Sequence, residues 1–193
     1  QLNLFVFRMT RMQRGPGAIT LLELGVEATP RSRRTTIWEM ACLRRLTRRG
    51  DRWDAAVVGA WPGAGGARVF AADLDNNGAL DLVVSGPAPT AIWLSKESRT
   101  LQRLNTTIDA DVWNVLDLSA DGQLDLVGLS AGRAVRLNGR GTRGYHHQVV
   151  RPRAQTAAGD QRINSFGIGG EVEVRSGLLV QKQTIAGAAV HVG

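Results

Sequence analysis

An acidic nine-residue motif occurs twice in this chain, 44 residues apart, and it constrains the fold more than any other feature. It reads DLDNNGALD over residues 73–81 and DLSADGQLD over residues 117–125. Alternating apolar residues flank each copy, and Gly, Asn and Asp separate them, which is typical of short antiparallel strands joined by turns. The period is close to the ~40–45 residues of a four-stranded propeller blade. We therefore predict an all-β fold, a partial β-propeller of antiparallel blades followed by a small β-domain.

Three regions follow from this pattern. Residues 61–144 carry the predicted propeller repeats. Residues 145–193 are predicted to form a small β-domain, because Val172 and Val174 alternate with charged residues and Gly177 can turn the chain back. Residues 1–60 are unassigned, although residues 36–38 and 43–46 resemble residues 92–94 and 101–104 and favour a degenerate blade without an acidic turn.

The acidic turns predict calcium sites. Calcium takes about six to eight oxygen ligands, mostly carboxylates and carbonyls. Positions 1, 3, 5 and 9 of each motif supply side-chain oxygens, position 7 supplies a backbone carbonyl, and glycine at position 6 allows a sharp turn. The predicted ligands are Asp73, Asp75, Asn77, Ala79 and Asp81 in the first loop, and Asp117, Ser119, Asp121, Gln123 and Asp125 in the second. The neutral Ser119 predicts weaker binding in the second loop.

The two alternatives to this calcium interpretation are an EF-hand and a pair of acidic turns that bind no metal. An EF-hand needs Glu at position 12 and helices on both sides, whereas position 12 is Val84 or Gly128 and the flanks are strand-like. Metal-free acidic turns would place carboxylates close enough to repel one another. We therefore expect calcium in both loops.

The two motifs resemble the FG-GAP or VCBS repeats of integrin-like propellers. Residues 161–177, which read QRINSFGIGGEVEVRSG, resemble the start of an ASPIC/UnbV domain, with Gly170 where that family usually has Ala. The combination is similar to the cartilage acidic protein family. This resemblance implies a secreted or cell-surface, calcium-binding, non-catalytic module that binds a protein, matrix or glycan ligand in adhesion. The alternative is an accessory or catalytic propeller of a secreted hydrolase or biosynthetic enzyme.

Catalytic motifs are weak. Residues 128–132 match G-x-S-x-G, but the alternating residues that follow predict a strand where a nucleophile elbow needs a helix. His146, His147 and His191 are too few for a zinc site with the single Cys42 far away in sequence. We expect no enzyme activity from these groups.

Partner classes are narrowed by charge and hydropathy. The net charge is +7, and all but two of the 24 basic residues are Arg, but they are scattered without an aromatic binding strand. No apolar run approaches the roughly 20 residues of a transmembrane helix. We predict no nucleic-acid binding and no membrane span, and we expect the chain to be part of a longer protein whose signal peptide, if present, lies upstream.

Overall fold

The chain folds into small antiparallel sheets. The computed structural model describes residues 11–13, 19–27, 40–49, 51–62, 67–96, 100–141, 144–154, 165–177 and 179–193, and these contain strands and no helix. The predicted all-β class is therefore confirmed. No helix in this described part is long and apolar enough to cross a membrane.

The strands form three sheets and a tail. The N-terminal sheet has the order β1 (Arg11–Gln13), β2 (Ile19–Glu27), β3 (Met40–Arg49), β4 (Arg52–Trp61). The central sheet has the order β5 (Arg68–Ala72), β6 (Asp81–Ser85), β7 (Ala91–Ser95), β8 (Leu101–Arg103). The outer sheet places β10 (Asp125–Ser130) between β9 (Asp111–Leu116) and β11 (Arg133–Leu137). In the tail, β12 (Gln148–Val150) pairs with β15 (Val190–Val192), and β13 (Glu171–Ser176) pairs with β14 (Leu179–Thr184).

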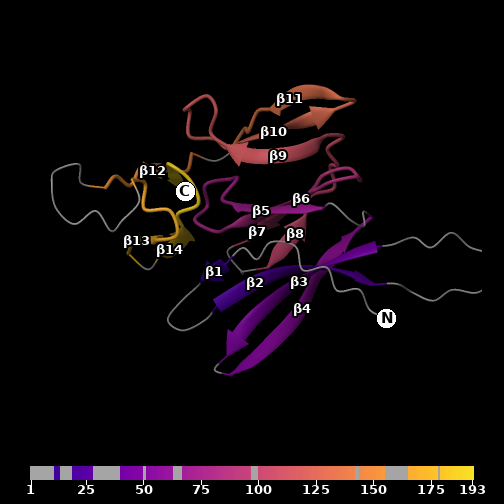
Figure 1. The fold of residues 1–193 in the computed structure, drawn as a ribbon, viewed down its shortest axis with the longest axis horizontal. Helices are drawn as coiled ribbons and strands as arrows, with labels where there is room; N and C mark the ends of the chain where they lie inside the picture. The colour runs from indigo at the N-terminus through magenta and orange to yellow at the C-terminus, as the bar shows by residue number, and fades with distance from the viewer. Residues whose placement is uncertain are drawn as a thin grey trace, which may run out of the picture.

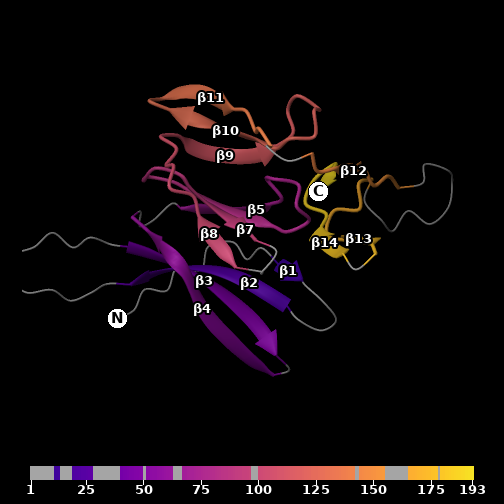
Figure 2. The same ribbon diagram turned by 180° about the vertical axis from the view of Figure 1, so that it is seen from behind.

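The central sheet lies between the other two (Figure 1 and Figure 2). Because successive side chains of a strand point to opposite faces, β6 contributes to two cores. Leu82 and Val84 pack with Leu43 and Trp61 of the N-terminal sheet. Val83 packs on the other face, in a cluster of buried residues with Ile92, Val112 and Leu126. Every residue of β6 is consequently buried.

The central and outer sheets share their strand register at the 44-residue offset. Leu82 pairs with Ala71 as Leu126 pairs with Val115. Val83 likewise pairs with Ile92 as Val127 pairs with Arg136. The match ends at a bulge between Val127 and Gly128. A Cβ at Gly128 would lie 2.0 Å from the Asp111 carbonyl oxygen, so the close approach of β9 requires glycine here.

Two predictions about the architecture stay predictions, namely the propeller and the boundaries of the three regions. The described sheets are stacked but do not form a closed ring, so the propeller stays a prediction, as do the region boundaries. Residues 36–38 of the suggested degenerate blade lie outside the described residues. The strands in the described residues of 1–60 belong to the N-terminal sheet, in which 43–46 lie in β3.

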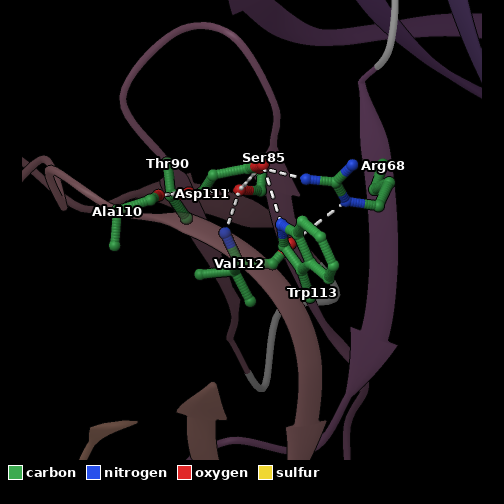
Figure 3. A network of polar contacts seen from close by, with 7 residues as sticks. All are labelled: Arg68, Ser85, Thr90, Ala110, Asp111, Val112 and Trp113. Carbon is green, nitrogen blue, oxygen red and sulfur yellow. Dashed lines mark hydrogen bonds and ion pairs between the residues drawn. The ribbon is translucent and has the colours of Figure 1, made fainter. Parts of the chain in front are cut away.

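A relay of hydrogen bonds joins the central and outer sheets (Figure 3). The Val112 amide donates to Ser85 Oγ at 2.6 Å, and Thr90 Oγ1 donates to the Ala110 carbonyl at 2.6 Å. Since the hydroxyl proton of Thr90 is used there, Ser85 Oγ is the donor in its 2.5 Å contact with Thr90 Oγ1. The relay satisfies polar groups that are sealed between two sheets.

Asp111 extends this contact towards the surface. Its carboxylate forms an ion pair with Arg68 and accepts a hydrogen bond from Trp113 Nε1 at 2.8 Å. Burial acts against the charged form, but the Trp113 and Arg68 hydrogen bonds outweigh it and hold the pKa of Asp111 below its usual value. Trp113 is 58% exposed, whereas Trp93 of the central sheet is buried.

The relay predicts the effect of losing one hydroxyl group. Ser85→Ala should lower the free energy of unfolding by about 1–3 kcal/mol, because it leaves the buried Val112 N–H without an acceptor. Urea denaturation measures this change. Ser130→Ala is the control, since Ser130 is only partly buried at the end of β10, next to an exposed turn, and it should change stability by less than about 0.5 kcal/mol. Equal losses in the two variants would contradict the relay.

Candidate metal centre

The first acidic loop is a compact turn between β5 and β6. Asp73 follows the last residue of β5 and accepts two backbone hydrogen bonds, from Asn77 N at 3.0 Å and from Gly78 N at 2.8 Å. Asn77 Oδ1 in turn accepts from Ala79 N at 2.8 Å. Gly78 has a φ of 81°, the left-handed conformation that position 6 was predicted to need. The loop therefore wraps its own amides around the Asp73 carboxylate.

Asp81 is the first residue of β6 and ends the loop. Its carboxylate accepts from Leu74 N at 2.8 Å and from Ser95 N at 2.7 Å, and the residue is 0% exposed. Because successive side chains of a strand point to opposite faces, Asp81 lies on the face opposite to the leucines that flank it in the sequence.

Three carboxylates gather in this loop. Asp73, Asp75 and Asp81 each contribute an oxygen, and these oxygens lie within 4.8 Å of one another. Asp75 Oδ1 is buried and has no hydrogen-bond partner in the described part of the chain. A buried, unpartnered carboxylate oxygen beside two further carboxylates is costly unless a cation or a proton compensates it.

Protonation is the compensation available without a metal. Burial raises the pKa of Asp73 to about 6, although hydrogen bonds from Gly78 and Asn77 oppose the shift. Burial likewise raises the pKa of Asp81 to about 7, opposed by the Ser95 and Leu74 amides and reinforced by Asp75 and Asp73. Both carboxyls are therefore poised to exchange a proton for a cation near neutral pH.

The second loop has the same backbone frame. Asp121 N and Gly122 N donate to Asp117 at 3.2 and 2.9 Å, and Gln123 N donates to Asp121 Oδ1 at 3.0 Å. Asp125 accepts from Leu118 N at 3.1 Å and from Gly139 N at 3.0 Å. Each of these five hydrogen bonds has a counterpart 44 residues earlier, between the same atoms of the loop.

The second loop differs in its charge balance. Arg136 Nη2 forms an ion pair with Asp125 Oδ2 at 2.9 Å. Burial of Asp125 opposes its charged form, but hydrogen bonds from Gly139, Leu118 and Arg136 outweigh this, and its pKa lies below the usual value. Ser119 and Asp121 are exposed. In the described chain, only the first loop gathers three potential metal-binding carboxylates this closely.

The two loops thus separate the ten predicted ligands into two groups. The structure brings Asp73, Asp75 and Asp81 together, with Asn77 in the same turn but engaged with Ala79 N and with the Ser95 carbonyl, to which its Nδ2 donates at 2.9 Å. Ala79 and Gln123 take equivalent places in the two turns. The structure does not bring Asp117, Ser119, Asp121 and Asp125 into such a cluster. Calcium in this second loop stays a prediction.

The tail lies against the first loop, and the sequence did not predict this contact. Gln181 Nε2 donates to Asp73 Oδ2 at 3.3 Å. His191 Nε2 lies 2.8 Å from Asn76 Oδ1, and since Asn76 Nδ2 donates to the Gly122 carbonyl, Asn76 Oδ1 is the acceptor and His191 Nε2 the donor. Nothing in the spacing of the tail residues indicated these contacts, because they join residues more than 100 positions apart.

A cleft of about 1290 Å³ opens where the tail meets the two loops. Its lining includes Asp117, His147, Arg151, Glu171 and His191. The His147 and His191 rings are stacked, with centroids 5.5 Å apart. Burial lowers the pKa of His191, and the charge of neighbouring His147 lowers it further while Asp117 acts in the opposite direction.

Ser130 lies in a strand–turn–strand context. It is the last residue of β10, and Ala131 and Gly132, with φ of 48° and 76°, form the two-residue turn into β11. A nucleophile elbow requires a helix at this point. The structure therefore agrees with the sequence in giving Ser130 no such context.

Comparison of the chain with protein-family models, with curated proteins and with solved structures found no match to any of them. The fold is all-β, and the described residues include a carboxylate cluster that is able to hold a metal ion.

The raised pKa values predict how stability depends on pH in the absence of calcium. Between about pH 4 and pH 7 the folded state holds protons on Asp73 and Asp81 that the unfolded state has released. The free energy of unfolding should therefore fall as the pH rises through this range. Asp81→Asn, which mimics the protonated side chain, should flatten the slope in chelator-containing buffers.

Asp125→Asn is the control for this experiment. Because the pKa of Asp125 is lowered, its contribution is present above about pH 4 and is lost as the pH falls through its folded value. The substitution should remove stability at neutral pH and leave the slope between pH 4 and 7 in place. Chemical denaturation at a series of pH values measures the free energy of unfolding. An unaltered pH dependence in Asp81→Asn would refute the assignment of this dependence to the Asp81 carboxyl.

Proposed function

We propose that this chain is a calcium-binding β-propeller repeat module of a secreted or cell-surface protein, which binds a protein, matrix or glycan partner and is not catalytic. The observation that carries the proposal is the Asp73–Asp75–Asp81 cluster, held in a turn whose hydrogen-bond frame recurs 44 residues later.

The chemistry of the cluster favours calcium over other metals. Its closely placed donors are carboxylate oxygens, with no thiolate or imidazole in the gathered set, and hard oxygen donors suit calcium and magnesium. Loop carbonyls and an amide oxygen can add to these in the flexible shell of calcium. Magnesium demands a smaller octahedral shell and keeps its waters, so it suits a buried set of protein oxygens less well.

The arrangement of the sheets supports the propeller part of the proposal. The central sheet is a four-stranded antiparallel meander, and its buried faces contact a sheet on each side, as the blades of a propeller contact their neighbours. The shared register of β6 and β10 supports a repeated unit. The resemblance to FG-GAP and VCBS repeats adds the adhesive role and the extracellular location to the proposal.

The first loop is the principal site in this proposal. Arg136 already supplies positive charge to Asp125, so a cation entering the second loop must compete with an ion pair. The equivalent position in the central sheet is the apolar Ile92, which leaves Asp81 without such a partner. Calcium binding in the second loop is expected to be weaker, as the neutral Ser119 also indicates.

One observation favours the alternative, an accessory or catalytic propeller. The cleft beside the loops collects two histidines, an arginine and three acidic residues, one of which is Asp73 of the cluster, and clefts between domains often hold ligands. A screen with chromogenic esters, glycosides and phosphates tests this. Turnover that is abolished by His147→Gln would replace the non-catalytic proposal with the alternative.

Calcium should stabilise the chain through the first loop. With a dissociation constant of about 10⁻⁴–10⁻³ M, typical of extracellular modules, millimolar calcium adds on the order of 0.4–1.4 kcal/mol to the free energy of unfolding. Thermal melts with calcium, with magnesium and with chelator measure the gain, which magnesium should reproduce poorly. Asp73→Asn should abolish it.

Asp117→Asn is the matched control. Asp117 accepts hydrogen bonds from two amides of the second loop, equivalent to those that Asp73 accepts in the first, but it lies outside the cluster. This variant should keep most of the calcium-dependent gain. A calcium-independent melting temperature in the unaltered chain, up to well above millimolar calcium, would remove the metal from the proposed function.

A further inference from the structure

We propose that Gln181 of the tail is a ligand of the same metal ion, so that the tail completes the site in the first loop. This inference rests on the proposed function. It assigns the side-chain oxygen Oε1 of Gln181, a residue outside the acidic motif, to the coordination shell of calcium.

Gln181 is buried against the carboxylate cluster. The residue lies on β14, is 6% exposed, and its Nε2 is 3.3 Å from Asp73 Oδ2. Its other amide atom, Oε1, is buried and has no hydrogen-bond partner among the described residues. A buried amide oxygen without a partner costs about 1–3 kcal/mol, so the position calls for a ligand.

A rotation of the amide group by 180° exchanges Nε2 and Oε1. In the structure, Nε2 faces Asp73 and donates to it. With an ion present, the rotated amide would place Oε1 about 3.3 Å from Asp73 Oδ2. Two oxygens each about 2.4 Å from one calcium ion, at roughly a right angle, are separated by about 3.4 Å. The observed spacing is therefore that of two neighbouring ligands of one ion.

The unpartnered oxygen of Asp75 supports the same centre. Asp75 Oδ1 and Gln181 Oε1 are both buried acceptors without donors, and both belong to residues at the Asp73 carboxylate. With the Gln181 amide rotated as described, one cation would satisfy both acceptors and compensate the negative charge. No additional hydrogen-bond donor is needed from the loop.

The tail is positioned firmly enough to deliver this ligand. His191 Nε2 donates to Asn76 Oδ1 in the same loop. Gly193 packs so closely that a Cβ there would lie 2.6 Å from Asp73 Oδ2, a space that only glycine fits. Calcium would consequently bridge two parts of the chain that are separated by 108 positions in sequence, and would fasten the tail to the central sheet.

The test is the calcium affinity of the full chain by isothermal titration. Gln181→Met, which keeps the size of the side chain and removes the oxygen, should weaken calcium binding by about 3- to 10-fold, as expected for the loss of one neutral ligand. Gln181→Glu should retain or strengthen binding, because it replaces the amide oxygen with a carboxylate. A residue that only donates a hydrogen bond to Asp73 would instead lose affinity in both variants.

Gln183→Met is the matched control. Gln183 lies on the same strand and donates from Nε2 to the His191 carbonyl at 2.8 Å, so its loss loosens the tail without removing a ligand. This variant should keep the calcium affinity of the unaltered chain. Hydrogen exchange gives a second readout, in which calcium should slow exchange of the β14 amides in the unaltered chain more than in Gln181→Met.

The outcomes separate the two proposals. If the unaltered chain binds no calcium, the proposed function fails and this inference fails with it. If the unaltered chain binds calcium and Gln181→Met binds it equally well, the proposed function stands and the role of Gln181 is overturned. Weaker binding in both Gln181 variants also overturns it, in favour of a positioning role.

Discussion

The burial of β6 on both faces is the constraint on which the rest of the structure depends. A strand sealed between two sheets must satisfy every polar group it carries inside. β6 begins with Asp81 and ends with Ser85, and the structure provides partners for both: the Leu74 and Ser95 amides at one end, and Val112 and Thr90 at the other. One strand thereby fixes the acidic loop at one end and the contact between the sheets at the other.

The two acidic loops share one hydrogen-bond pattern but differ in how the charge of their aspartates is compensated. Both loops wrap five equivalent hydrogen bonds around their aspartates, so the backbone alone does not distinguish them. The loops differ at two positions: the neutral Ser119 takes the place of Asp75, and Arg136, which forms an ion pair with Asp125, takes the place of Ile92. In the first loop burial raises the pKa of Asp73 and of Asp81, and the charge of Asp75 adds to both shifts, whereas hydrogen bonds from Gly139, Leu118 and Arg136 hold the pKa of Asp125 below its usual value. A repeat can therefore keep its fold while its tendency to bind a metal ion changes.

The sequence predicted what depends on local pattern. The period of the acidic motifs located both turns, the glycine at position 6 predicted the left-handed conformation of Gly78 and Gly122, and strand alternation placed Asp81 beside the core. Long-range contacts could not be predicted in this way. Gln181 and His191 reach the first loop through the docking of the tail, which no spacing in the sequence encodes. Ring closure depends in the same way on how the sheets associate.

The stoichiometry of calcium binding tests the central claim most directly. Equilibrium dialysis of the full chain against radioactive calcium counts the bound ions without reference to stability or to any variant. We predict one ion per chain at a dissociation constant of about 10⁻⁴–10⁻³ M, with a second ion only at much higher concentration. Two equivalent ions per chain would contradict the distinction between the loops, and no bound ion up to well above millimolar calcium would contradict the metal centre itself.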